Sequence, residues 1–437
     1  MEDKDLASIE KQNLFSAINQ VISQPDFCKN PGKDFTRNRK MGAPILMQYM
    51  LSMSALSLDK DLYQYFKENY PSMVPPTKSA FVQQRAKLSD NAFPNLLHAY
   101  NSMGNDSKTY RGFYLFSFDG TALNTARNPE SETYFEKGGY NQFLITALFD
   151  LCNYTYKDIE IKARPKQYEV RSAINLLSKT DLPPNSIVIC DRLYATLNLI
   201  EHLNRKGVKY LIRCKESHTL TEINSLPDCE CDVVCHRQIR TTQTKEDREA
   251  FKSGEAYYIQ PYSNHNSELS RWDFESPYNM TFRIVKVWIG NKWEVLITNL
   301  SKESFSADSL KELYALRWGI ETSFRDLKYS IGLTNLHSRN ESYTVQEIYA
   351  RVIMFNYCQR IARQVVVENQ VDNIHLYQVN FTQAIHIARN YFRKAGDFCS
   401  AVCEDIKRYI LPVRKGIKDI RKAVRQKAFI PFLYRVA

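Results

Sequence analysis

The chain has 437 residues, of which 43% are hydrophobic and 24% charged, and its formal net charge is +11. This composition is typical of a soluble globular protein of two to four domains. No apolar run reaches the roughly 18 residues of a membrane-spanning helix, and the initial segment MEDKDLASIEKQ lacks the features of a secretory signal. We therefore expect a cytoplasmic protein, not a membrane or secreted one.

Basic residues are concentrated at the C-terminus, where the segment from Asp405 onward holds ten Lys or Arg and two acidic residues. Such a segment indicates a polyanionic partner, most often nucleic acid, and a tail that only aids solubility is the alternative. The ten cysteines form no tight framework, which indicates reduced thiols. The spacing of Cys229, Cys231, Cys235 and His236 fits no common zinc finger.

Residues 1–108 are expected to form a helical DNA-binding region. Apolar residues at helical spacing predict helices in LFSAINQVI, PILMQYMLSMSAL and LDKDLYQYFKENY. The segment 75–100 is typical of two helices joined by a turn at 89–91, as in a helix-turn-helix. In it we expect Arg85 and Lys87 to contact DNA. Residues 101–108, NSMGNDSK, are polar and rich in turn formers, so they are the best candidate linker.

The pattern changes at residues 109–213. Three apolar strands are predicted first, in RGFYLFSFDGT, QFLITALFDLC and YTYKDIEIKA. A helix (VRSAINLLSK), a strand at 187–190, a helix (LNLIEHLNRKG) and a strand (VKYLIRCK) follow, which indicates an α/β layer. Asp119 and Asp191 each come directly after a predicted strand, where α/β folds place chemistry. In the alternative interpretation each acid caps a helix or forms a turn.

Residues 214–305 are rich in short strands and turns, and we expect a β-rich insertion there. Its clearest feature is the hairpin FRIVKVWIGNKWEVLITNL, which turns at Gly290-Asn291. Residues 306–340 would return to the core with a closing helix, and residues 341–437 would form a helical, basic C-terminal region.

A single helix is predicted over Ser309–Lys328, SLKELYALRWGIETSFRDLK, with Ser309 and Glu312 as a capping box. At about 100° per residue, four polar side chains form one stripe beside the apolar face: Tyr314, Arg317, Glu321 and Lys328. In one interpretation Arg317 and Glu321 are an ordinary i,i+4 ion pair. In the other, Glu321 is a metal ligand and the neighbouring cations hold phosphates.

Three acids far apart in the chain are candidates for one metal site. Asp119 and Asp191 lie on neighbouring predicted strands, and Glu321 lies on a helix that would flank the same sheet. Mg²⁺ prefers carboxylate oxygens. In a two-metal site, one ion activates water or a 3′-hydroxyl and the other stabilises the leaving oxygen of a phosphodiester.

These motifs carry a resemblance to a known family. FDGT at 118–121, DRLY at 191–194 and Y-x2-R-x3-E-x6-K at 314–328 resemble the DDE transposases of bacterial insertion sequences. Among these they are similar to the group with the Tyr-Arg-Glu-Lys signature (the IS-four family). The resemblance covers about residues 33–340. The family often has Gly in the second motif, where this chain has Leu193.

The resemblance implies an α/β fold with an RNase H-like catalytic core, interrupted by the β insertion and flanked by the helical terminal regions. Asp119, Asp191 and Glu321 would be the catalytic residues and would bind Mg²⁺, with Mn²⁺ as a substitute. Tyr314, Arg317 and Lys328 would contact phosphates near the scissile bond. The residue after the second acid, Arg192, is a further candidate for DNA contact.

The implied activity is cut-and-paste transposition, in which the element ends are nicked and the freed 3′-hydroxyl attacks, often through a DNA hairpin, before strand transfer into target DNA. The implied partners are the terminal inverted repeats and target DNA, bound by a homodimer in the bacterial cytoplasm, associated with the nucleoid. Trp288 and Trp293 are candidates for stacking a flipped base, or are packing residues.

Two alternatives remain open. One is an RNase H-like nuclease that cuts DNA without joining strands. The other is a DNA-binding protein derived from a transposase that no longer catalyses a reaction, against which the complete acidic triad argues.

Overall fold

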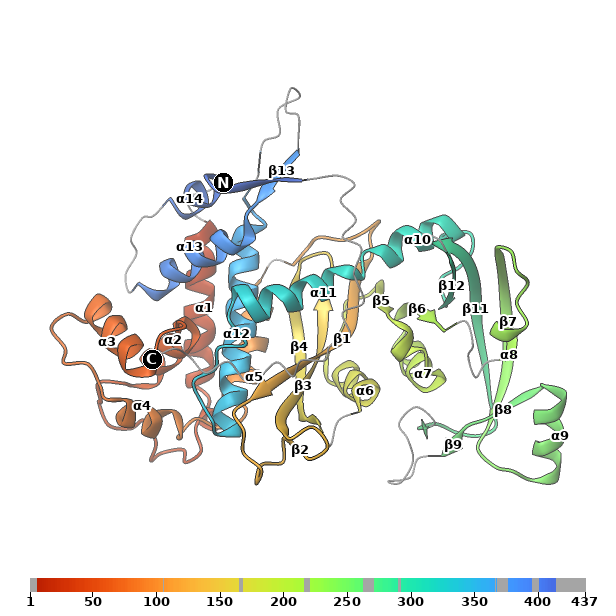
Figure 1. Ribbon diagram of the computed structural model, residues 1–437, viewed down its shortest axis with the longest axis horizontal. Coiled ribbons are helices and arrows are strands. Elements are labelled where there is room, and N and C mark those ends of the chain that lie inside the picture. Colours follow the sequence, from red (N-terminus) through yellow and green to blue (C-terminus); the bar gives the residue numbers. More distant parts are fainter. Residues whose placement is uncertain are drawn as a thin grey trace.

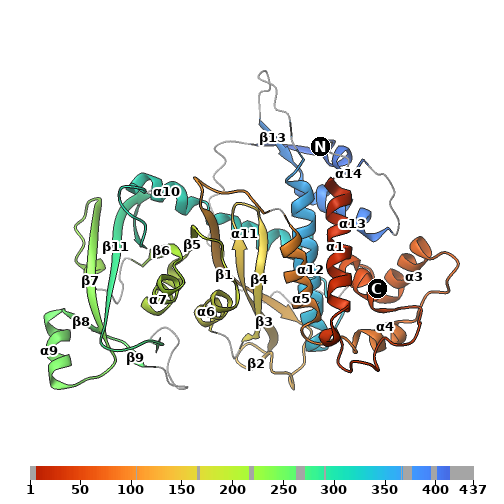
Figure 2. The same cartoon turned by 180° about the vertical axis from the view of Figure 1, so that it is seen from behind.

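The computed structural model describes residues 6–104, 106–164, 168–215, 221–261, 271–289, 292–365, 367, 376–394 and 401–413. The predicted turn at Gly290-Asn291 and the basic tail from residue 414 onward lie outside these residues. The elements are arranged in a row (Figure 1): helices of both terminal regions lie at one end, the central strands in the middle, and the strands of the insertion at the other end. Figure 2 shows the same order from behind.

The N-terminal region is helical, as predicted. Its helices are α1 (Leu6–Ile22), α2 (Ala43–Ser52), α3 (Leu58–Asn69), α4 (Lys78–Arg85) and α5 (Ala92–Met103). The C-terminal region adds α12 (Glu341–Ala362), α13 (Phe381–Arg393), α14 (Val402–Lys407) and a small antiparallel pair of strands, β13 (Leu376–Val379) and β14 (Ile410–Val413). Helix α12 is buried along most of its length and packs against α1, α2, α5 and α13, so the two terminal regions share one core.

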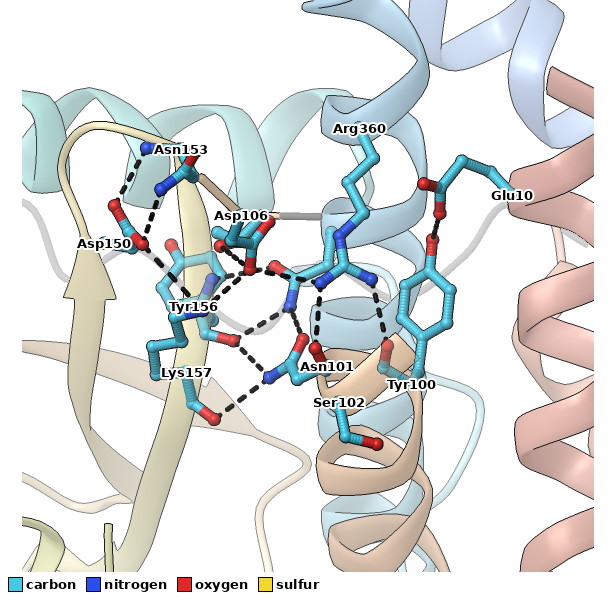
Figure 3. A network of polar contacts seen from close by, with 12 residues as sticks. Glu10, Tyr100, Asn101, Ser102, Asp106, Asp150, Asn153, Tyr156, Lys157 and Arg360 are labelled. Atoms are coloured by element: carbon cyan, nitrogen blue, oxygen red, sulfur yellow. Dashed lines mark hydrogen bonds and ion pairs between the residues drawn. The ribbon is translucent and has the colours of Figure 1, made fainter. Parts of the chain in front are cut away.

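The segment expected to be a linker is a packed connection. Helix α5 continues to Met103, and the carboxylate of Asp106 accepts hydrogen bonds from Lys157 Nζ at 2.7 Å and Arg360 Nη2 at 3.2 Å (Figure 3). Arg360 also donates to the carbonyl of Tyr100 at 3.0 Å. These polar contacts tie α5, α12 and the edge of the central sheet together, so the helical region is fixed to the sheet.

The central sheet has the order expected of an RNase H-like core. Its strands are β1 (Tyr114–Thr125), β3 (Tyr140–Asp150), β4 (Thr155–Ala163), β5 (Ser186–Cys190) and β6 (Lys209–Cys214), with a short β2 (Tyr134–Phe135) at the end of β3. In space they lie β4-β3-β1-β5-β6, and β1 is antiparallel to β3 but parallel to β5, which is parallel to β6. Helix α6 (Glu169–Lys179) precedes β5, and α7 (Leu197–Arg205) connects β5 to β6. The predicted fold class is confirmed.

The strands of the insertion extend this same sheet. They are β7 (Cys231–Arg240), β8 (Ala256–Tyr258), β11 (Tyr278–Ile289) and β12 (Lys292–Thr298), accompanied by α8 (Thr221–Asn224), α9 (Lys245–Ser253) and the short pair β9 (Gln260–Pro261) and β10 (Arg271–Trp272). Strand β12 pairs antiparallel with β6, and β11, β7 and β8 follow in order. The predicted hairpin is confirmed as β11 and β12, and its pairing with β6 joins the insertion to the core.

Side chains on the two faces of the sheet belong to two apolar cores. Phe116 and Phe118 of β1 pack with α6 and α7, whereas Leu115 and Leu123 belong to the core that contains α5, α11 (Trp318–Arg325) and α12. Because side chains alternate along a strand, Asp119 faces the side of α11 and Gly120 faces the side of α6. Within the described residues, no helix combines the length and apolar character needed to cross a bilayer.

The prediction of one helix over 309–328 is wrong. The first helix, α10 (Ala307–Ala315), begins after Ser306, whose Oγ accepts from the backbone N–H of Ser309 at 3.3 Å. Between α10 and α11 the backbone hydrogen bonds become i→i−3, as from Arg317 to Tyr314, and a π-helical turn (Asp326–Ser330) follows α11. The i→i−3 bonds wind the chain more tightly and the π-helical turn winds it more loosely, so both interrupt the 100° period on which the predicted stripe depended.

Candidate active site

Asp119 lies within β1, not at its end as predicted. The parallel pairing of β1 with β5 stops at Phe116, where Ser117 Oγ donates to the carbonyl of Ile189 at 2.7 Å. Beyond this point β1 continues to Thr125 paired only with β3. Asp119 therefore lies where β1 leaves β5, between a parallel and an antiparallel neighbour, and ligands of α/β sheets bind at such points.

Asp191 is the first residue after β5, as predicted. Its Oδ1 accepts from the backbone N–H of Leu193 at 2.8 Å and caps a short 3₁₀ helix (Arg192–Tyr194). The alternative interpretation of Asp191 as a cap is thus correct for its local structure. The alternation along β5 also places its side chain on the side of α11, since Ile187 and Ile189 belong to that core.

Asp119 is surrounded by charges. Its pKa is raised to about 7, chiefly by burial and also by the negative charges of Glu169 and Asp191. The backbone N–H of Gly120, 2.9 Å from Oδ1, and the guanidinium of Arg317 lower the pKa of Asp119. Asp119, Asp191 and Arg317 therefore lie within electrostatic range of one another, although β1, β5 and the α10–α11 segment are far apart in the sequence.

The α10–α11 segment supplies Tyr314, Arg317 and Glu321. Arg317 Nη2 donates to Glu321 Oε1 at 2.7 Å. Burial acts to lower the pKa of Arg317, but the neighbouring Tyr314, Glu321 and Asp119 outweigh it and raise the pKa. Both Tyr314 and Arg317 are buried, and neither the Tyr314 hydroxyl nor Arg317 Nε has a hydrogen-bond partner among the described residues. Two buried polar groups thus lack a geometrically defined partner beside the acids.

Two other predicted DNA contacts are less closely connected to these acids. Lys328 lies on the π-helical turn, where burial lowers its pKa, and it makes none of the ion pairs found among the described residues. Arg192, the residue directly after Asp191, is exposed. Trp288 and Trp293 face each other across the hairpin, with ring centroids 4.9 Å apart, and Trp288 is about half exposed.

Arg85 is not placed for DNA contact. It is 2% exposed, and its guanidinium donates to Glu347 at 3.0 Å, Gln346 at 3.2 Å and the carbonyl of Tyr343 at 2.8 Å. Arg85 therefore anchors α4 to α12 and presents no free guanidinium to DNA. The other residue predicted there, Lys87, lines a cavity of about 380 Å³ together with three further cations, Lys33, Arg37 and Arg39.

Sequence reasoning missed Glu169 and Arg213. Glu169 opens α6, and burial raises its pKa. Arg213, near the end of β6, lies within electrostatic range of Tyr314 and forms an ion pair with Glu294. Neither residue belongs to a recognisable motif, so only their positions next to the acids reveal them.

The carboxylates of Asp119, Asp191 and Glu321 are donors of the type that a divalent metal takes, but the three are not gathered around one point. In the described part of the chain, no three His, Cys, Asp or Glu side chains are placed to hold a metal, and this includes Cys229, Cys231, Cys235 and His236. Asp119 and Asp191 offer the oxygen ligands that hard cations take, and a cation would relieve the repulsion that raises the pKa of Asp119.

A family model described as a transposase DDE domain matches residues 111–357, more than half of the chain. The chain belongs to this transposase family. The transposase domain thus starts just before β1, contains both aspartates and Glu321, and ends within α12. Comparison with curated protein sequences found no match. Among solved structures, a cryo-EM structure of a piggyBac transposase synaptic complex with hairpin DNA is similar, with a TM-score of 0.41 and 10% identity over 95% of this chain and 86% of that chain.

Proposed function

We propose that this transposase cuts DNA at the ends of an insertion sequence and joins the freed 3′ ends to target DNA, as in the cut-and-paste IS-four group. The main support is one juxtaposition: Asp119 and Asp191 face the same side of the sheet, where the α10–α11 segment brings Arg317. Two acids and a buried cation with a free donor are suited to a phosphodiester flanked by divalent cations.

In this proposal Asp119, Asp191 and Glu321 hold Mg²⁺ or Mn²⁺. The metal, when bound, activates the attacking water or 3′-hydroxyl and stabilises the leaving oxygen. Arg317 and Tyr314 bind the phosphate, since Arg317 Nε and the Tyr314 hydroxyl have no hydrogen-bond partner among the described residues. Arg192 and Lys328 would contact the flanking phosphates.

The remaining parts of the chain would bind DNA away from the chemistry. We propose that residues 1–108 contact the terminal repeats through the cavity lined by Lys33, Arg37, Arg39 and Lys87. Residues 109–213 and 306–340 would form the catalytic core, 214–305 the insertion, and 341–437 a basic C-terminal region. Because two element ends must be paired, the active species would be a homodimer on DNA.

Asp119→Asn tests this function. The substrate is linear DNA that carries the sequences flanking the reading frame on both sides, incubated with the chain and Mg²⁺. We expect the variant to bind these ends like the unmodified chain and to lose cleavage. Asp308→Asn is the matched control, because Asp308 is an exposed acid on α10 outside the site. Full cleavage by Asp119→Asn would refute the assignment.

Precut ends separate the alternatives. If the chain is a transposase, precut ends with a free 3′-hydroxyl and a circular target yield joined products. A nuclease of the same fold cuts the uncut ends but yields no joined product, and a DNA-binding derivative binds the ends without either reaction.

A further inference from the structure

We propose that Glu169 is a positioning residue of this active site, which holds the segments bearing Asp119 and Asp191 in a fixed relation to each other. The inference rests on the proposed function for its catalytic consequence, but the contacts that carry it lie within the described structure. Glu169 is the first residue of α6 and belongs to neither acidic motif.

The first contact is with Gly120, directly after Asp119. A Cβ placed on Gly120 would lie 2.5 Å from Oε1 and 2.7 Å from Oε2 of Glu169, closer than real Cβ atoms approach. The carboxylate of Glu169 therefore occupies the space that a side chain at position 120 would need. Glycine at position 120 leaves room for this close approach, which places the carboxylate against the backbone of the first acidic segment.

The second contact is with Tyr194, three residues after Asp191. The hydroxyl of Tyr194 donates to Glu169 Oε1 at 2.7 Å, and the Tyr194 ring is fully buried. Tyr194 ends the 3₁₀ helix that Asp191 caps, so its position is coupled to that of the second acid. One carboxylate thus touches both segments.

Glu169 acts from the opposite face of β1. Gly120 faces α6, whereas Asp119 faces α11, because neighbouring side chains of a strand point to opposite sides. Glu169 therefore supports Asp119 through the backbone instead of sharing its ligand.

The contacts predict a specific pattern among variants. Glu169→Ala removes both contacts, Tyr194→Phe removes one, and Glu169→Gln keeps an acceptor for the Tyr194 hydroxyl. Because a misplacement of about 1 Å can cost roughly 100-fold in rate, we expect Glu169→Ala to lower single-turnover cleavage by about 10- to 100-fold with unchanged affinity for the ends. Glu169→Gln should recover most of the rate. The double variant Glu169→Ala/Tyr194→Phe should be no slower than Glu169→Ala alone. Glu169→Ala already removes the hydrogen bond with Tyr194, so Tyr194→Phe has nothing further to remove.

Hydrogen exchange tests the coupling without any activity. In the DNA-free chain, Glu169→Ala should increase amide exchange in both 118–121 and 191–194, whereas Glu312→Ala, at an exposed glutamate of α10, should change neither. Unchanged exchange in either segment would overturn the inference, and so would a rate loss that merely follows a loss of folded protein. If the unmodified chain cleaves no DNA, the proposed function fails, and the exchange result still decides the role of Glu169.

Discussion

Arg317 and Glu321 form an ion pair across one turn of helix, with 2.7 Å between Nη2 and Oε1. The acid expected to bind metal is therefore paired with the cation expected to bind phosphate, and the same guanidinium lies near Asp119. Because Arg317 is buried, separating the pair would be costly unless each side chain gained a new partner of opposite charge. A divalent cation on Glu321 and a phosphate on Arg317 would supply those partners.

Arg317→Ala should tighten the binding of Mn²⁺ to the DNA-free chain while it weakens DNA cleavage. Removal of the guanidinium takes a positive charge away from Asp119 and Glu321, so a metal ion meets less repulsion. We expect about a three- to tenfold gain in Mn²⁺ affinity, where tenfold corresponds to ~1.4 kcal/mol of binding free energy. Titration calorimetry measures this affinity.

The control for this change is Arg325→Ala, which removes an exposed arginine of the same helix. It should leave Mn²⁺ binding unchanged. If Arg317→Ala weakens Mn²⁺ binding, the pair with Glu321 does not compete with the metal and the proposed exchange of partners is wrong.

Gly120→Ala should destabilise the fold through Glu169. The new methyl group would force the carboxylate at the flexible end of Glu169 to move away. The buried Tyr194 hydroxyl would then lose its acceptor, which typically costs about 1–3 kcal/mol. Urea unfolding measures the loss. Combining the change with Glu169→Ala should restore part of the stability, because the obstructing carboxylate is then absent.

Gly42→Ala is the comparison for this cost. A Cβ at Gly42 meets nothing nearer than 3.9 Å, so the substitution should have the smaller effect. If Gly120→Ala is as stable as the unmodified chain, the carboxylate of Glu169 does not fill that space in solution.

The predictable parts of this site were those with local signals. Apolar runs located β1, which carries Asp119, and β5, which leads into Asp191, and the two strands pair side by side in the sheet. The break between α10 and α11 has no such signal, because Leu316 and Arg317 are good helix formers and the tighter turn arises only in the folded chain. Glu169 was missed for a related reason: an acid in the first turn of a helix is ordinary, and its contacts with Gly120 and Tyr194 are tertiary.

Acid should destabilise this protein partly through Glu347. Burial acts to raise the pKa of Glu347, but hydrogen bonds from His337 and the charge of Arg85 outweigh it and lower the pKa from 4.5 to about 2. A lowered pKa means that the stabilisation is present above pH 4.5 and is lost as the pH falls toward 2. By linkage this amounts to about 3 kcal/mol.

Glu347→Gln isolates this contribution. The stability difference between the unmodified chain and the variant, measured by urea unfolding, should be largest near neutral pH and shrink as the pH falls from 5 to 2.5. A difference that stays constant over this range would show that Glu347 keeps an ordinary pKa.

Arg85 and Lys87 lie two residues apart, yet their removal should have opposite consequences. Arg85→Ala leaves the buried Glu347 without its cation, which typically costs about 3–5 kcal/mol, and its effect on DNA binding should follow only from the loss of folded protein. Lys87→Ala should leave the unfolding midpoint almost unchanged but weaken the binding of DNA ends. It should also reduce the slope of log affinity against log salt concentration by about one unit, as expected for the loss of one phosphate contact. Fluorescence anisotropy at several salt concentrations, together with urea unfolding, distinguishes the two. If Lys87→Ala binds the ends with an unchanged salt dependence, the cavity beside α4 does not hold the DNA backbone.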